Sequence, residues 1–316
     1  MAGPVEIPSA PRRAHGFWYL LLLALASLIW SAQGTAVKFL EPYLGPIAIT
    51  FLPFYVTTVL LLPLLLYQRR RNPNRQRPTW SDWRKFVIAG IGGQVLAQLG
   101  MTWGITLSLA SNAAILNLMI PVISAALASV MLGERLTGLR VLCLAVGLAG
   151  VFMMSVEDLR NSKFLQETYL GGNLLILLGC LGSSFYNVYC KGLLVRFQEV
   201  EILIFSYVTA SLATLPLLVW AEPLDTGALA SLDLKAWLAF GFLAVFMYGA
   251  SMLLFFHVLE HLPVTVASAS LYLVPVFGVL LASTILGERL SPLSLVGAAI
   301  VLASTVLVMR YDTASR

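Results

Sequence analysis

The chain has 316 residues, of which 59 % are hydrophobic and only 11 % are charged, and its mean hydropathy is +0.86. A soluble domain is typically about 45–50 % apolar and about 25 % charged. This composition excludes a water-soluble enzyme, a disordered chain and a small disulfide scaffold, and it indicates an integral membrane protein. The net charge of +5 is then better explained by cytoplasmic loops than by nucleic-acid binding, which we do not expect.

Ten apolar stretches are long enough to cross a membrane, and their interiors hold no Asp, Glu, Lys or Arg. A membrane helix needs roughly 20 apolar residues, and a helix satisfies all of its backbone polar groups within one segment. The predicted spans in chain order are 17–37, 46–67, 86–107, 112–132, 140–156, 170–190, 202–221, 236–256, 264–286 and 292–309. The fold expected from them is all-α and integral to the membrane.

Basic residues between the spans predict the orientation. With both termini placed in the cytoplasm, 15 of the 20 Lys and Arg residues fall on the cytoplasmic side and 5 on the other. The segment from Arg69 to Arg77 supplies many of the 15. Because cytoplasmic loops are enriched in Lys and Arg, both termini are expected to be cytoplasmic.

An internal repeat divides the chain into halves. Residues 113–136 align without a gap on residues 267–290, and 11 of these 24 positions are identical. The offset of 154 residues spans five helices, an odd number, so the second half must insert upside down. The predicted organisation is a tail at 1–16, a five-helix unit at 17–156, a connecting loop at 157–169, a second five-helix unit at 170–310 and a tail at 311–316.

Several short motifs recur in order in the two halves. They are Trp30, Lys38, Pro46, Pro121, the Gly-Glu-Arg-Leu segment at 133–136 and Gly150 in the first half, and Leu262-Pro263, Tyr272, Pro275 and the Gly-Glu-Arg-Leu-Ser segment at 287–291 in the second. With these motifs, residues 17–310 resemble the EamA-type members of the drug/metabolite transporter superfamily. The resemblance implies ten helices in two five-helix domains, and often the export of amino acids or other small metabolites.

Uncharged polar residues mark the candidate substrate site. Gln94, Gln98 and Thr102 form one stripe of a helix, and the offset of 154 residues pairs Gln94 with Tyr248. Amide, phenol and aromatic groups suit a small polar or amphipathic solute, although buried amides also bond simply between helices. The candidate substrate-binding residues are Trp30, Gln33, Gln94, Gln98, Asn117, Tyr186, Asn187, Tyr248 and Tyr272.

Two symmetric prolines and two loop motifs are candidate moving parts. Pro121 and Pro275 are expected in mid-helix, as hinges or as fixed kinks. In the loops, Glu134-Arg135 and Glu288-Arg289 are expected to form ion pairs, or to place a carboxylate near the N-terminus of the following helix. A gating contact is the alternative.

The segment from His257 to His261 reads His-x-x-Glu-His, as in inverted zincin enzymes. The only other histidine is His15, whereas a catalytic zinc usually has three protein ligands. We therefore expect no metal, no cofactor and no enzyme activity. Without an ionisable group at depth, facilitated diffusion or exchange is favoured, or coupling through an interfacial group such as Glu260.

The sequence thus predicts a multi-pass secondary transporter of a bacterial cytoplasmic membrane. Export of amino acids or related metabolites by alternating access is favoured. The alternatives are a carrier that takes up, exchanges or expels another polar metabolite or drug, and a non-transporting sensor or assembly protein. The expected partners are a small-molecule solute and the lipid bilayer. The sequence does not fix the oligomeric state, and a monomer is favoured.

Overall fold

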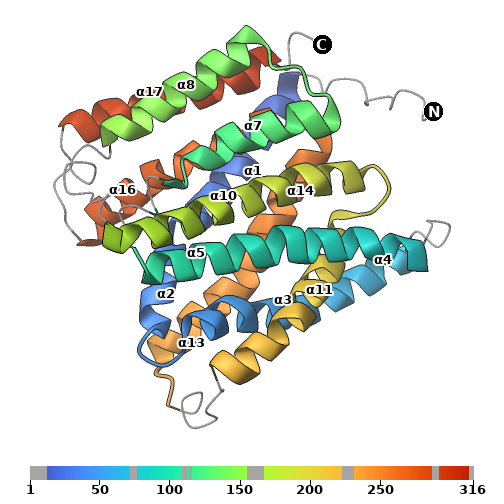
Figure 1. Cartoon of the computed structure of the whole chain (residues 1–316). Coiled ribbons are helices and arrows are strands. Elements are labelled where there is room, and N and C mark those ends of the chain that lie inside the picture. The colour runs from blue at the N-terminus through green and yellow to red at the C-terminus, as the bar shows by residue number, and fades with distance from the viewer. Residues whose placement is uncertain are drawn as a thin grey trace.

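The computed structural model describes residues 13–71, 77–108, 113, 116–154, 167–222, 231–286 and 292–312. Within these ranges the regular secondary structure is entirely helical (Figure 1). The prediction of an all-α membrane protein is therefore confirmed. Six helices are long and apolar enough to cross a membrane, and four shorter apolar helices accompany them. Together they correspond to the ten predicted spans.

The elements of each half follow one another in chain order. The first half contains α1 (Arg13–Ser31), α2 (Gln33–Leu40), α3 (Pro46–Arg71), α4 (Trp80–Val87), η1 (Ile88–Val95), α5 (Leu96–Thr106), α7 (Met119–Leu132) and α8 (Gly138–Met154). The second half contains α10 (Glu167–Leu194), α11 (Glu199–Ala221), α13 (Leu234–Phe242), η2 (Leu243–Ala250), α14 (Ser251–His261), α15 (Val264–Ala269), η3 (Ser270–Tyr272), α16 (Leu273–Leu286) and α17 (Pro292–Asp312).

Several predicted spans are interrupted, and two kinds of interruption occur at equivalent places in the two halves. The third and eighth spans each contain a π-helical stretch, η1 and η2, whose starts lie 155 residues apart. In the ninth span the 3-10 turn η3 separates α15 from α16, and in the fourth a turn at 117–118 precedes α7. The repeat found in the amino-acid sequence therefore extends to the irregular turns of the backbone. Such turns within helices often mark functional sites.

The two prolines expected in mid-helix each follow an irregular turn of their span. Pro121 is the third residue of α7, after the turn at 117–118, and Pro275 is the third residue of α16, after η3. Their roles as hinges or as fixed kinks stay predictions. The prolines inside helices are Pro53 and Pro63 of α3 and Pro216 of α11.

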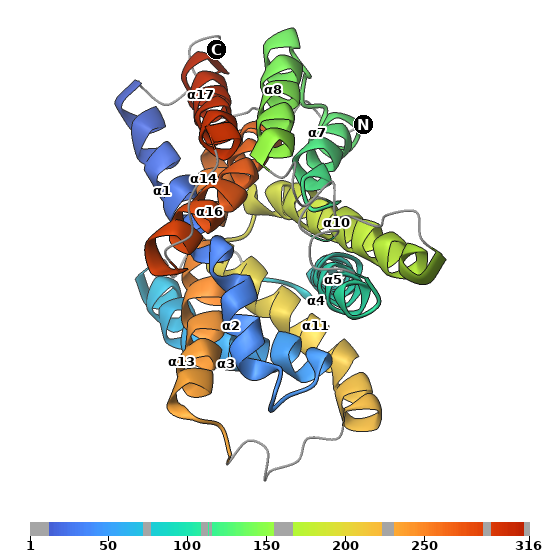
Figure 2. The same cartoon turned by 90° about the vertical axis from the view of Figure 1, so that its left-hand side faces the viewer.

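Helices approach one another most closely where glycines meet. Figure 2 shows α5 beside α10 and α8 beside α17. A Cβ atom added to Gly100 of α5 would lie 2.8 Å from the backbone nitrogen of Gly179 in α10. A Cβ on Gly150 of α8 would lie 2.9 Å from the carbonyl oxygen of Gly297 in α17. These contacts have the close backbone approach typical of small residues in membrane helices.

Candidate functional site

A glutamine and a tyrosine from different halves meet in the interior. Gln94 of η1 is 4 % exposed and Tyr186 of α10 is 2 % exposed. The hydroxyl of Tyr186 lies 2.8 Å from Oγ of Ser206 in α11 and close to the Gln94 side chain. Two predicted site residues are thereby brought together, and Ser206 joins them.

A second glutamine–tyrosine pair repeats this arrangement with the residues exchanged. The Tyr248 side chain of η2 is 4 % exposed and lies close to the side chain of Gln33 in α2. Tyr248 lies 154 residues after Gln94, and Tyr186 lies 153 residues after Gln33. Each half thus contributes a glutamine to one pair and a tyrosine to the other. We call Gln94–Tyr186 and Gln33–Tyr248 the exchanged pairs.

Two aromatic side chains lie between the helices of the exchanged pairs. The ring of Phe54 in α3 stacks on Tyr248 with a centroid distance of 4.3 Å, and it meets Tyr207 of α11 edge-on at 4.5 Å. The Tyr207 hydroxyl donates to the carbonyl oxygen of Tyr248 at 2.9 Å. Phe54 and Tyr207 are 153 residues apart, so equivalent positions of the two repeats touch. Such a contact belongs near the pseudo-twofold axis.

Sequence reasoning missed Phe54, Ser206 and Tyr207. Aligning the second span with the seventh at an offset of 153 residues would have paired Phe54 with Tyr207. Nothing in the sequence singles out Ser206, because its role depends on the contact between α10 and α11.

The other predicted site residues contact different elements. Trp30 packs edge-on against Phe255 at 5.4 Å, and the Asn117 side-chain oxygen accepts a weak hydrogen bond from the Cys180 thiol at 3.5 Å. Tyr272 is buried, with no hydrogen-bond partner for its hydroxyl among the described residues. Gln98 is half-buried and Asn187 is buried. Thus only four of the nine candidates form the exchanged pairs.

Glu134 binds the other half of the protein. Its carboxylate accepts hydrogen bonds from the backbone N–H of Val264 at 2.6 Å and of Thr265 at 3.2 Å, and from the Thr265 hydroxyl at 3.0 Å. These donors open α15, whose positive helix end favours a carboxylate. The sequence predicted that Glu134 would pair with Arg135 or lie near the start of the following helix. The structure instead places its carboxylate at the start of α15, in the other half. Glu288 and Arg289 lie outside the described residues.

Arg135, the neighbour of Glu134, is exposed and contributes its backbone rather than its charge to a described contact. Its carbonyl oxygen accepts a hydrogen bond from the guanidinium of Arg140 at 2.7 Å. Arg140 itself is buried at the start of α8. A guanidinium therefore holds the loop in place from inside the following helix.

A second carboxylate caps a helix of the opposite half, and sequence reasoning missed it. Glu222, which follows α11, accepts from the backbone N–H groups of Ile47 and Ala48 at 2.9 Å each. These groups open α3. A Cβ atom on Gly45 would lie 2.4 Å from the Glu222 carboxyl carbon, so glycine leaves the space that the carboxylate fills. Each half therefore supplies one carboxylate to a helix start in the other.

Comparison with known proteins identifies a family. The model of the EamA-like transporter family matches residues 17–156 and 170–310. A solved crystal structure shares the fold with a TM-score of 0.74 at 19 % identity, covering 92 % of this chain and 97 % of the other.

Three curated relatives have names that refer to transport. A probable terminal-alkyne amino-acid exporter of Streptantibioticus cattleyicolor is 27 % identical, over 76 % of this chain and 78 % of that protein. An uncharacterized transporter of Archaeoglobus fulgidus is 24 % identical, over 92 % of this chain and 98 % of its own length. An S-adenosylmethionine uptake transporter of Rickettsia conorii is 22 % identical, over 92 % and 91 %. With both of its halves matched by the family model, the chain belongs to the EamA-like transporter family, whose members are membrane transporters and not enzymes.

Proposed function

We propose that this transporter is a secondary carrier that exports amino acids or related small metabolites by alternating access. The observation that carries the proposal is the exchanged pairs, Gln94–Tyr186 and Gln33–Tyr248. Each pair joins helices from both halves of an inverted repeat, where carriers of this architecture hold their substrates. Rocking one half against the other would present these amides and phenols to each side of the membrane in turn.

The chemistry of the pairs supports a small polar solute. Amide and phenol groups both donate and accept hydrogen bonds, so they can bind the ammonium and the carboxylate of a zwitterion without a fixed charge. Phe54 and Tyr207 add an aromatic surface beside them. The relative named as a probable amino-acid exporter supports this substrate class and direction. The relatives named for S-adenosylmethionine uptake favour the second candidate, a carrier that imports another polar metabolite.

The location of the helix ends supports cytoplasmic termini. Helix α1 begins and α17 ends at the same end of the bundle (Figure 1). The end of α3, with Arg69, Arg70 and Arg71 in its last turn, carries further positive charge. By the positive-inside rule this charge favours the cytoplasmic side. The protein is proposed to act there as a monomer in a bacterial cytoplasmic membrane.

The buried charges support transport without a coupling group at depth. Among the described residues, the buried acidic and basic side chains are Asp82, Arg140 and Glu201. They belong to the first turns of α4, α8 and α11. Because ion-driven carriers usually keep an ionisable group within the membrane, facilitated diffusion or exchange is the proposed mode.

Metabolite export tests this function. Cells producing the parent protein should accumulate one class of solute, expected to be amino acids, in the medium. Tyr186→Phe and Tyr248→Phe should each reduce that export at equal membrane abundance, because each removes the hydroxyl of one exchanged pair. Tyr67→Phe is the matched control, since Tyr67 is 59 % exposed.

Two results would contradict the proposal. If the medium is identical to that of empty-vector cells, the protein does not export the solutes those cells contain. Uptake assays with radiolabelled S-adenosylmethionine would then test the second candidate. Unchanged export by both tyrosine variants would show that transport does not depend on the exchanged pairs.

A further inference from the structure

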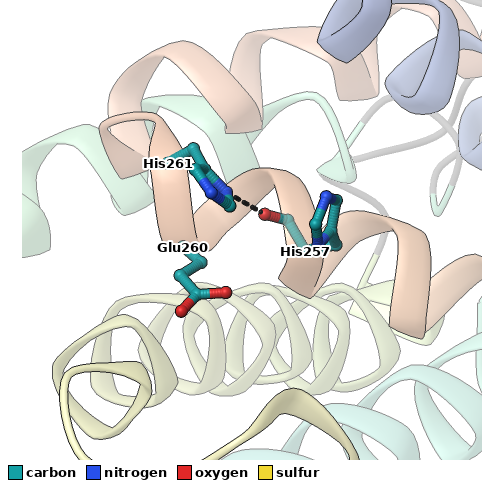
Figure 3. Close-up of side chains that lie close together, drawn as sticks. All are labelled: His257, Glu260 and His261. Carbon is teal, nitrogen blue, oxygen red and sulfur yellow. Dashed lines mark hydrogen bonds between the residues drawn. The ribbon is translucent and has the colours of Figure 1, made fainter. Parts of the chain in front are cut away.

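We propose that the protein binds one divalent transition-metal ion, such as Zn²⁺, Co²⁺ or Ni²⁺, at the end of α14 through His257, Glu260 and His261. Each of these side chains offers one ligand atom, and the three atoms lie within 4.8 Å of one another (Figure 3). The residues occupy positions i, i+3 and i+4 of one helix, which places them on the same face. The proposal replaces the expectation from the sequence that this segment binds no metal. It concerns binding and no catalysis, and it does not depend on the transported solute.

The hydrogen bond of His261 prepares its ring for a metal. Nδ1 of His261 lies 2.9 Å from the carbonyl oxygen of His257. Because a carbonyl oxygen only accepts, the ring nitrogen must carry the proton, and this leaves the Nε2 lone pair for a metal. An imidazole that donates its other N–H to a backbone carbonyl is the usual arrangement of a metal-binding histidine.

His257 faces a carboxylate from a neighbouring helix. Nδ1 of His257 lies 3.8 Å from Oε1 of Glu199, in the first turn of α11. A carboxylate beside one ring nitrogen favours a proton there and makes the other nitrogen a better ligand. Each imidazole therefore has an oxygen atom beside its Nδ1, the carbonyl oxygen of His257 for His261 and the Glu199 carboxylate for His257.

The surroundings hold the cluster in place and leave it accessible. The Tyr19 ring stacks on His261 with a centroid distance of 5.3 Å. The Lys191 ammonium donates to the carbonyl oxygens of Leu259 at 2.5 Å and Glu260 at 3.0 Å, and so anchors the last turn of α14 to α10. Glu260 and His261 are exposed, and the His257 side chain is 44 % exposed. An ion can therefore enter from the aqueous side.

The donor set selects the class of ion. Two imidazoles and one carboxylate are the ligands preferred by zinc and its divalent neighbours, and three protein ligands leave a fourth position for water. The site lies at a helix end just before Pro263 and close to the start of α15, where Glu134 binds. A bound ion would join successive turns of α14 and stiffen this connection.

Cobalt absorption provides the test. The full-length protein is purified in detergent without a polyhistidine tag and titrated with Co²⁺, and zinc binding is measured by calorimetry. The parent should bind one ion per chain. The double variant His257→Ala, His261→Ala should lose saturable binding, and Glu260→Gln should weaken it at least tenfold. His15→Ala, which changes the remaining histidine of the chain, should bind like the parent.

Stability separates lost ligands from lost folding. Zinc should raise the melting temperature of the parent and of His15→Ala but not that of the double variant, whose melting temperature without metal should match the parent's. If the double variant does not fold, the single variants His261→Gln and Glu260→Gln replace it. The proposal is overturned if the parent shows no saturable binding, or if the ligand variants bind like the parent.

Discussion

Two pairs of helices related by the inverted repeat pack in different ways. In the first pair, α5 lies against α10 through Gly100 and Gly104 on one side and Gly172, Gly179 and Gly182 on the other. In the second pair, α14 lies against α1, and the equivalents of Gly100 and Gly104 are Leu254 and Val258.

Larger side chains occupy the second pair where glycines occupy the first. Tyr19 of α1 is equivalent to Gly172, and its ring stacks against His261. Glycines bring two backbones into van der Waals contact over several turns, whereas larger side chains meet between α1 and α14. The same topology therefore supports one pair packed through glycines, the tight pair, and one pair packed through larger side chains.

The largest effect should come from filling the tight pair. In Gly100→Ala the new methyl group would lie 2.8 Å from the backbone nitrogen of Gly179 and 2.8 Å from the carbonyl oxygen of Leu175. The helices must separate, at a cost of about 2–3 kcal/mol of unfolding free energy. The melting temperature in detergent and the folded yield measure this loss.

A matched glycine provides the control for that substitution. A Cβ atom on Gly241 in α13 meets nothing within 4 Å. Gly241→Ala should therefore leave the melting temperature nearly unchanged. Equal behaviour of the two variants would contradict the close approach of α5 and α10 at Gly100.

The next effect concerns the contact between the halves at α15. Glu134→Gln keeps the shape of the side chain but removes the charge that receives three hydrogen bonds from Val264 and Thr265. Hydrogen bonds to a charged group are typically worth about 1.5–3 kcal/mol, so we expect a loss of about 2 kcal/mol. Thermal unfolding measures it, and the exposed neighbour is the control, because Arg135→Gln leaves its carbonyl contact with Arg140 intact. If Arg135→Gln lowers the unfolding free energy as much as Glu134→Gln or more, the hydrogen bonds of the Glu134 carboxylate are not the cause of the loss.

The smallest effect should be the coupling within each exchanged pair. Double-mutant cycles with Gln94→Met and Tyr186→Phe, and with Gln33→Met and Tyr248→Phe, isolate the interaction within each pair. Hydrogen bonds between membrane helices average about 0.6 kcal/mol, and we expect this value in both cycles because the pairs are related by the repeat. A coupling in one cycle and none in the other would mean that the two pairs have diverged in role.

The sequence predicted the helices better than their irregularities. Ten apolar stretches correspond to the six long and four shorter apolar helices, since crossing hydrocarbon demands an apolar length that is written directly in the chain. The π-helical stretches were not predicted, because they arise where another helix comes close. A Cβ atom on Gly93 of η1 would lie 2.7 Å from the ring of Tyr186, a contact that no local pattern reveals.

The candidate site was predicted in its members but not in its contacts. Gln94 and Tyr248 were matched as equivalent positions. The structure places Gln94 beside Tyr186 of the sixth span and Tyr248 beside Gln33 of the first. Glu222 was missed for a similar reason. Its partners, Ile47 and Ala48, lie 175 and 174 residues away. They bind the carboxylate through backbone N–H groups, which no side chain in the sequence marks.

The number of helices, their all-α class and the inverted relation of the two halves follow from the linear chain. Hydrophobic length, the odd number of spans per repeat and the position of Lys and Arg are all properties of that chain. Which glutamine meets which tyrosine, and which helix start each carboxylate caps, depends on how the helices pack. Lipid tails are as apolar as the helices, so hydrophobicity leaves the packing partner open. The choice was made by glycines such as Gly100 and Gly179 and by the buried polar groups that had to find one another.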